Sequence, residues 1–191
     1  MRTIVIVEGA TDKLALTLAA RRLGRDIEAE DIAIIPIGGA HAITRVLAEL
    51  AGEHPQVRIA GLCDEGEEGV FRAALERAGY GSNLSRNELE RIGFFVCSAD
   101  LEDELIRAVG APAISRLAEL EGDAQAWHTF QRQPAWQGQA TRQQFRRFVR
   151  SVSDRNVRYI RAILAALEPS QVPPPLRLLL THVGLRPAAG E

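Results

Sequence analysis

Short apolar runs alternate with segments of helical periodicity over the first hundred residues of the chain. The runs are apolar throughout rather than alternating with polar residues, which is typical of strands covered on both faces. Their alternation with helices through short connections predicts an α/β fold, a mostly parallel four-stranded sheet flanked by helices. The predicted strands span residues 3–7, 32–37, 57–63 and 94–97.

Between these strands, apolar side chains recur at helical spacing, and glycines end several of the segments. After residue 111 the strand pattern stops and only helical segments follow. We therefore predict an α/β domain over 1–111, an all-helical subdomain over 112–185 and a flexible tail over 186–191. The predicted helices span 12–23, 40–50, 67–78, 101–109, 113–121, 123–131, 141–152, 155–167 and 175–183.

The composition indicates the cellular compartment of the protein. Hydrophobic residues make up 46% of the 191 residues, which is enough for a packed core. No apolar segment approaches the roughly 20 residues of a membrane span, and the N-terminus lacks a signal-peptide pattern. Cys63 and Cys97 lack metal-binding spacing and are typical of buried thiols in a reduced compartment. The sequence thus predicts a cytoplasmic protein without a membrane segment.

The formal net charge of −2 hides an asymmetry along the chain. Residues 1–130 hold 13 basic against 22 acidic residues, whereas residues 131–191 hold 10 against 3. An acidic half can hold metal ions, and a basic half can contact phosphate. A solvated surface with accidental clustering is the alternative, which charge alone leaves open.

Acidic residues follow three of the four predicted strands. Glu8 ends the first strand, Asp64 ends the third, and Asp100 follows the fourth. The carboxyl ends of parallel strands meet at one edge of a sheet, where binding sites form in such folds. Further acids lie just beyond these three: Asp12, Glu65, Glu67, Glu68, Glu102, Asp103 and Glu104.

Each acid also has a structural explanation. Asp12, Glu67 or Asp100 alone is more typical of a helix cap, because acids at helix N-termini satisfy free N–H groups and match the helix dipole. Glu8 is different, since glutamate caps poorly and is costly at a buried strand end. Carboxylates gathered without Cys or His favour Mg²⁺ or Mn²⁺ as the bound ion.

Glycines accompany the acids at the same predicted edge. Gly9 and Gly66 lie beside them, where the backbone could need a positive φ or a close approach to a ligand. Gly38 and Gly39 follow the second strand, and by themselves they favour a simple turn. The phosphate-binding pattern GxxxxGK[ST] is absent, and Lys13 is the only lysine.

Four stretches of the sequence carry a resemblance. In chain order they are VEGATDKLAL, IPIGGAHAI, GLCDEGEE and GFFVCSADLEDELI. Together they resemble a TOPRIM domain, the Rossmann-like metal-binding fold of topoisomerases, bacterial primases and some nucleases. They are most similar to the OLD (overcoming lysogenization defect) nuclease family and to short bacterial TOPRIM nucleotidyl transferase/hydrolase domain proteins. FQRQPAW and VPPPLRLLLTHV resemble the helical region of that group, so the resemblance extends over nearly the whole chain.

The resemblance implies cleavage of DNA by a two-metal mechanism, in which carboxylates hold two Mg²⁺ or Mn²⁺ ions and a phosphodiester is hydrolysed. OLD nucleases also carry an ATPase domain. This sequence shows none, so ATP dependence would need an ATPase partner in trans. The implied metal ligands are Glu8, Asp12, Asp64, Asp100 and Glu102, with Glu67 or Glu68 as a further ligand.

Two residues depart from the pattern of the family. Gly66 stands where the third TOPRIM motif has its second aspartate, and Glu67 or Glu68 could replace that acid. Asn156 stands where similar proteins carry a lysine suited to stabilising transition-state charge, and Arg155 or Arg158 could supply the cation instead. The predicted catalytic residues are Glu8, Asp64, Arg155 and Asn156.

Arginines crowd residues 142–161, where Asp154 is the only acid. Residues spaced by four share a helical face, and a row of arginines can follow a DNA backbone. Pairing with the acidic half of the chain is a nearly equal alternative. The predicted nucleic-acid-binding residues are Lys13, His41, Arg142, Arg146, Arg147, Arg150, Arg155 and Arg158.

Taken together, the sequence predicts a divalent-metal-dependent DNA endonuclease. A nucleic-acid-binding or partner-binding TOPRIM module with weak or no activity is the second hypothesis, favoured by Gly66 and Asn156. Nucleotidyl transfer of the primase type uses the same metals and ranks last, because no template-binding element is recognised. DNA is the expected partner. The oligomeric state stays open, with a homodimer as one alternative.

Overall fold

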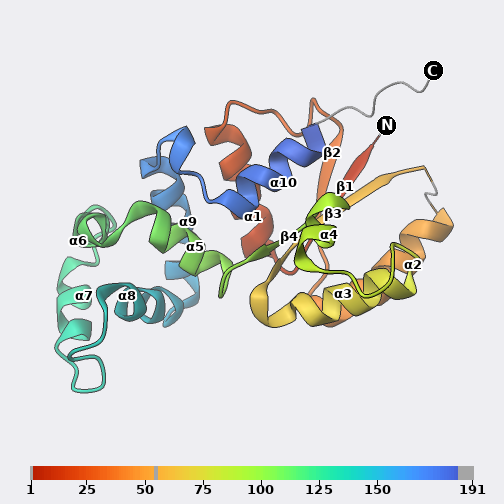
Figure 1. Ribbon diagram of the computed structural model, residues 1–191. Coiled ribbons are helices and arrows are strands. Elements are labelled where there is room, and N and C mark those ends of the chain that lie inside the picture. Colours follow the sequence, from red (N-terminus) through yellow and green to blue (C-terminus); the bar gives the residue numbers. More distant parts are fainter. Residues whose placement is uncertain (1, 54–55, 185–191) are drawn as a thin grey trace. The chain divides into compact units, whose positions relative to one another are not determined.

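The computed structural model describes residues 2–53 and 56–184, and residue contacts divide the chain into two compact units (Figure 1). The sheet unit comprises Met1–Asp100 and Pro174–Glu191, and the helical unit comprises Leu101–Pro173. Each unit has its own hydrophobic core. No described helix is long and apolar enough to cross a membrane.

The predicted four-stranded parallel sheet is confirmed. Its strands lie in the order β2-β1-β3-β4, and every neighbouring pair is parallel. β1 is buried along its whole length, because helices cover both faces of the sheet. The strands are β1 (Thr3–Val7), β2 (Ile32–Pro36), β3 (Arg58–Asp64) and β4 (Phe94–Cys97).

Helices cover the two faces of the sheet (Figure 1). α1 (Ala10–Arg22) and α10 (Pro174–Gly184) pack on one face, where α10 contacts β3, β4 and α1. α2 (Ile43–Glu53) and α3 (Glu68–Arg77) pack on the other face, and α4 (Arg86–Arg91) contacts β4. Short 3-10 turns precede α2 and α3, namely η1 (Ala40–Ala42) and η2 (Glu65–Glu67).

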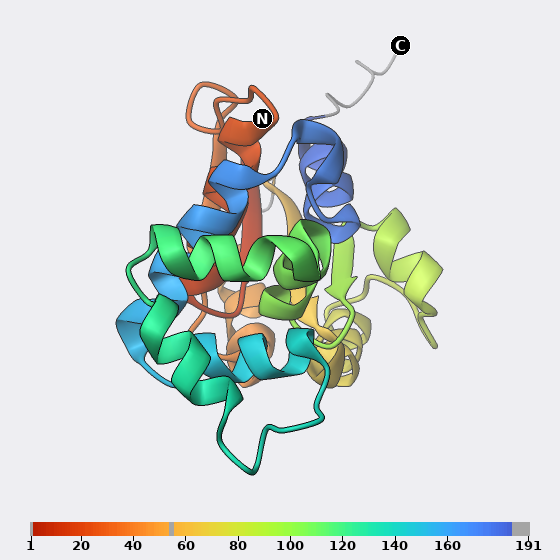
Figure 2. The ribbon, with the colours of Figure 1, turned by 90° about the vertical axis from the view of Figure 1, so that its left-hand side faces the viewer.

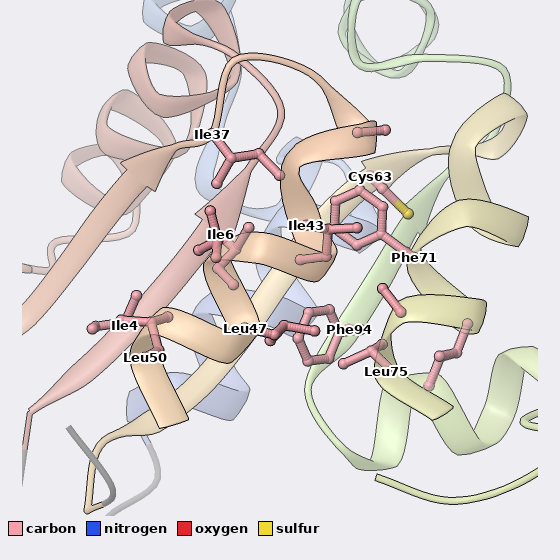
Figure 3. Close-up of a cluster of buried hydrophobic side chains, with 14 of the residues drawn as sticks. Ile4, Ile6, Ile37, Ile43, Leu47, Leu50, Cys63, Phe71, Leu75 and Phe94 are labelled. Atoms are coloured by element: carbon pink, nitrogen blue, oxygen red, sulfur yellow. The ribbon is translucent and has the colours of Figure 1, made fainter. Parts of the chain in front are cut away.

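One hydrophobic core lies between the sheet and helices α2 and α3 (Figure 3). Ile6 of β1, Ile43 of α2 and Phe71 of α3 are fully buried there. The rings of Phe71 and Phe94 lie 6.5 Å apart. Burial of such side chains contributes roughly 1.5–3 kcal/mol each relative to exposure, which holds the helices on the sheet.

Gly61 in β3 makes room for an aromatic ring in this core. A Cβ at this position would lie 2.6 Å from the ring of Phe94 and 3.1 Å from the carbonyl oxygen of Ile6. The close approach of the ring to β3 therefore depends on the missing side chain.

β2 is an edge strand with few free donors. The backbone N–H and C=O groups of its odd-numbered residues point toward β1, as the bond from Ile37 N to Val7 O shows. The N–H and C=O groups of its even-numbered residues therefore point away from the sheet. Ile32 N is bonded to Ile27 O, and Pro36 has no N–H. Ile34 is thus the residue of this strand that offers an outward N–H.

The helical unit is built around an aromatic core. The ring of Phe145 lies 5.3 Å from Trp127 and 5.0 Å from Tyr159, both edge-on. All three side chains are buried, as expected for a core rather than for a surface that stacks on bases. Figure 2 shows this unit in green to blue: α5 (Leu101–Val109), α6 (Ala111–Leu120), α7 (Ala124–Gln131), α8 (Thr141–Arg150), α9 (Ser153–Ala166) and η3 (Pro169–Gln171).

The two units divide the chain differently from the predicted domains, which end at residues 111 and 185. α5 belongs to the helical unit because it packs on α8 and α9. α10 belongs to the sheet unit because it packs on β3 and β4, where Leu176, Leu179 and Leu180 are buried, and because Arg25 Nη1 donates to Leu180 O. Helical periodicity marks a helix but not the core that the helix joins. The predicted tail, 186–191, lies outside the described residues.

Candidate metal centre

The sheet topology brings Glu8 and Asp64 together. The chain adds β2 on one side of β1 and β3 on the other, so β1 and β3 flank the switch point where ligands bind in open α/β sheets. Glu8 follows β1, and Asp64 is the last residue of β3. The backbone N–H of Asp64 donates to Glu8 Oε1 at 2.9 Å. This bond holds the Glu8 carboxylate at the carboxyl edge of the sheet.

The ionised form of Glu8 is disfavoured by its surroundings. Burial raises the pKa of Glu8 above its usual value, the Asp64 N–H opposes the rise, and the negative charge of Glu67 adds to it. The pKa of the neighbouring Cys63 thiol is also raised, first by burial and then by the charges of Glu8 and Asp64. The charge of Glu67 thus disfavours ionised Glu8, and a cation bound beside the two acids would relieve this repulsion.

Asp12 caps the helix that follows Glu8. Its Oδ2 accepts the N–H of Gly9, the N-terminal cap of α1, at 2.7 Å. Asp12 thus has the helix-capping role that was the alternative to metal binding. A role for Asp12 in metal binding would come in addition to the cap.

The surroundings of Glu67 and Glu68 differ. The Glu68 side chain is 13% exposed and is paired with Arg86 and Arg72, and its hydrogen bond to Arg86 is the main cause of its lowered pKa. These guanidinium groups occupy both of its carboxylate oxygens. Glu67, by contrast, acts on Glu8 through its charge. Of these two acids, Glu67 is the better placed to join Glu8 at a metal ion.

Asp100 and Glu102 fall in different units. Asp100 is buried and is the last residue of the first segment of the sheet unit. Glu102 lies in α5 of the helical unit, where Asn156 Nδ2 donates to its Oε1 at 2.9 Å. Asn156, a predicted catalytic residue, is thus bonded to an acid of its own unit.

The donor chemistry at the sheet edge fits a hard divalent ion, because carboxylate oxygens are the ligands that Mg²⁺ and Mn²⁺ prefer. In the part of the chain that the structure describes, however, no three Asp, Glu, His or Cys side chains converge as a metal-binding group. Binding of an ion would therefore draw further side chains toward Glu8 and Asp64.

The backbone conformation favours glycine at Gly38 and Gly39, whereas the conformation of Gly9 and Gly66 does not require it. The φ angles of Gly38 and Gly39 are 78° and 112°, which side-chain-bearing residues rarely adopt, and both N–H groups donate to Glu8 O at 3.0 Å. Gly9 is extended, with a φ of −140°. A Cβ at Gly66 would have no neighbour within 4 Å, and its φ is not positive. The first of the two roles expected for Gly9 and Gly66, a positive φ, is therefore absent, and the close approach to a ligand stays a prediction.

The N-terminal part of the chain matches a known family. Residues 1–64 match the family model described as Overcoming lysogenization defect protein-like, TOPRIM domain. This segment is therefore similar to the TOPRIM domain of OLD-like proteins. Such a domain is a nuclease-type module, and TOPRIM domains generally bind divalent metals. The matched residues include Glu8, Asp12 and Asp64.

The fold beyond this TOPRIM segment also has counterparts. The C-terminal region of the OLD protein of Xanthomonas campestris pv. campestris gives a TM-score of 0.70 at 21% sequence identity, over 96% of this chain and 94% of that one. The C-terminal region of the Burkholderia pseudomallei OLD protein gives 0.63 at 17% identity, over 95% and 96%. At these identities the similarity shows the fold alone. A comparison with curated proteins found no match.

Several of the predicted DNA-binding arginines pair with acids inside the helical unit. Arg142 Nε lies 3.1 Å from Asp103 Oδ1. Arg155 and Arg158 both contact Asp123 Oδ2, at 3.2 and 2.9 Å. These pairs tie helices together and leave less charge for a phosphate backbone. Of the other predicted contacts, Arg146 is half-buried and the exposed ones are Lys13, His41, Arg147 and Arg150.

Arg86 contacts Glu65 and Glu68 at this edge but belongs to no chemical motif in the sequence, and the sequence predicted no role for Glu65. The signal that could have placed Arg86 is a capping box. Ser85 Oγ accepts the N–H of Glu88 at 3.4 Å, and Glu88 Oε2 accepts the N–H of Ser85 at 2.7 Å. This S-x-x-E spacing predicts a helix start, and α4 begins there with Arg86.

Proposed function

We propose that this protein is a divalent-metal-dependent DNA endonuclease. The observation that carries the proposal is the pair of Glu8 and Asp64 at the switch point of an OLD-like TOPRIM domain, linked by the bond from Asp64 N to Glu8. An acid that is partly buried beside other acids, with a raised pKa, is typical of a functional site that takes a cation.

In this proposal Glu8, Asp64 and Glu67 hold the metal, with Asp100 as a ligand from the loop after β4. Two Mg²⁺ or Mn²⁺ ions would supply Lewis acidity toward the phosphate oxygens. The protein's own part is to fix the carboxylates. The Asp64 N–H orients the Glu8 side chain, and the Gly38–Gly39 turn is bonded to the Glu8 carbonyl.

Cleavage of supercoiled plasmid tests the proposal. The wild-type chain is incubated with Mg²⁺, Mn²⁺, Ca²⁺ or EDTA, beside Glu8→Gln and the exposed surface variant Glu28→Gln. We expect nicked or linear DNA with Mg²⁺ or Mn²⁺, the same products from Glu28→Gln, and none from Glu8→Gln. Cleavage that survives EDTA or the Glu8→Gln change would refute a carboxylate-held metal.

A DNA-binding module without cleavage is the second candidate. Gly66 in place of an acid favours it, as does the pairing of Glu68 with arginines, because both reduce the carboxylates available to an ion. A salt-sensitive gel shift without cleavage would support this function. Gly66→Asp, for which the structure has room, is then the change expected to restore metal binding.

A further inference from the structure

A chain of polar contacts links the start of α4 to the loop after β4, all within the sheet unit. Arg86 Nε donates to Glu68 Oε2 at 3.1 Å, and Arg86 Nη2 lies 3.4 Å from Glu65 Oε1. The other oxygen of Glu65, Oε2, accepts the backbone N–H of Ala99 at 3.1 Å. Because Glu65 follows Asp64 directly, these contacts join the carboxyl end of β3 to the carboxyl end of β4.

The residue that receives this contact has an unfavourable backbone. Ala99 has a φ of 63°, in the left-handed region that residues with a Cβ avoid. The other described non-glycine residues with a positive φ are Asp31 and Asn83, whose residue types tolerate it. Alanine has no polar side chain to stabilise such a turn, so its surroundings must hold it.

We propose that Glu65 is a positioning residue, whose carboxylate holds the Ala99 turn and thereby places Asp100 at the carboxyl edge of the sheet. The inference rests on the proposed metal centre, in which Asp100 is a ligand. A change of the Ala99 backbone would redirect Asp100, because the two residues share a peptide bond. Groups that orient metal ligands typically contribute 10–100-fold to metal affinity.

The Glu65 side chain depends on its partners for its own position. It is 53% exposed, so packing alone does not fix it. Arg86 supplies the second contact, and Arg86 is itself held by Glu68 and by its place at the capped start of α4. This assigns a role to the middle residue of the Asp64-Glu65-Gly66 motif, whose side chain turns to Ala99.

The test uses the full chain in four forms: wild type, Glu65→Ala, Glu65→Gln and the surface control Glu28→Ala. Mn²⁺ affinity is measured by titration calorimetry, and hydrogen exchange of the Ala99 amide by NMR. In Glu65→Ala we expect Ala99 to exchange about tenfold faster and Mn²⁺ to bind about tenfold more weakly. Glu65→Gln keeps an oxygen acceptor and should stay close to wild type in both, as should Glu28→Ala.

Three outcomes separate this inference from its alternatives. Equal weakening of Mn²⁺ binding in Glu65→Ala and Glu65→Gln would mean that lost charge, not positioning, is responsible, and would overturn it. Unchanged exchange of Ala99 in Glu65→Ala would overturn it as well. If the wild type binds no Mn²⁺, the proposed metal centre fails, and the Ala99 exchange still decides whether Glu65 holds the turn.

Discussion

The Glu8 carboxylate lies where its own charge is disfavoured. Burial and the charge of Glu67 raise the pKa of Glu8, so the folded state favours the protonated carboxyl. At neutral pH the ionised carboxylate therefore lowers the free energy of unfolding of the metal-free protein. Glu8→Gln keeps the shape and an acceptor for the Asp64 N–H while removing the charge. We expect this variant to be more stable than wild type by on the order of 1 kcal/mol in urea unfolding at neutral pH with EDTA.

A bound metal ion should reverse the order of stability of wild type and Glu8→Gln. An ion that binds the folded protein stabilises it, so Mn²⁺ should raise the unfolding free energy of wild type and leave Glu8→Gln unchanged. Glu28→Gln, in which the altered side chain is exposed, is the matched control and should behave as wild type in both conditions. Lower stability of Glu8→Gln than of wild type in EDTA would contradict the electrostatic argument.

Among the elements, continuous apolar runs were predictable and a polar helix was not. β1 and β4 have the bounds predicted from continuous apolar runs. α4 was not predicted, because its six residues bury only Leu89 and so carry no apolar stripe. The sequence predicted that Glu8 and Asp64 lie at the same edge of the sheet. Their direct contact depends on the adjacency of β1 and β3, which was not predicted. The contact of Glu65 with Ala99 joins segments 34 residues apart and depends on side-chain geometry that no sequence pattern encodes.

β3 should be sensitive to any side chain at Gly61. Gly61→Ala would bring a Cβ within 2.6 Å of Phe94 and force the ring or the strand to move. We expect a loss of about 1–3 kcal/mol in the free energy of unfolding, measured by urea denaturation. Gly69→Ala in α3 is the matched control, since nothing lies within 4 Å of its Cβ, and it should stabilise the protein by up to about 1 kcal/mol. Similar values for both variants would exclude the packing explanation.

The stability that the packing of α10 on the sheet provides should depend on pH through His182. Its ring meets Phe95 edge-on with centroids 6.0 Å apart, and burial, followed by the charge of Arg58, lowers the pKa of His182 below its usual value of about 6.5. Because the unfolded chain binds this proton more tightly, the stability due to neutral His182 is present above about pH 6.5 and is lost as the pH falls below it.

His182→Gln isolates this contribution. Between about pH 8 and about pH 5, wild type should lose more unfolding free energy than the variant, because glutamine does not take up a proton. The measurement is urea unfolding at a series of pH values. Parallel curves for the two proteins would show that His182 titrates alike in the folded and unfolded chains.

In the molecule as a whole, some arginines of the C-terminal region pair with acids of the helical unit, and others are exposed to solvent. Arg158 contacts Asp123 and Glu121, whereas Arg147 is exposed. If the protein binds DNA as proposed, Arg147→Ala should weaken binding and reduce the slope of log K against log salt concentration by about 1. Arg158→Ala should instead lower the melting temperature and leave that slope largely unchanged. The reverse assignment would show that the internal pairs open on binding.

The edge strand β2 affects the tendency of this protein to aggregate at high concentration. A sheet that ends in an apolar strand such as Ile32–Pro36 invites strand addition from another chain, which is a route to aggregation. Here the N–H of Ile32 is occupied by Ile27, and Pro36 contributes none, so an incoming strand finds a donor only at Ile34. The loop before β2 and one proline thus reduce the donors that an added strand could use, without any charged residue in the strand itself.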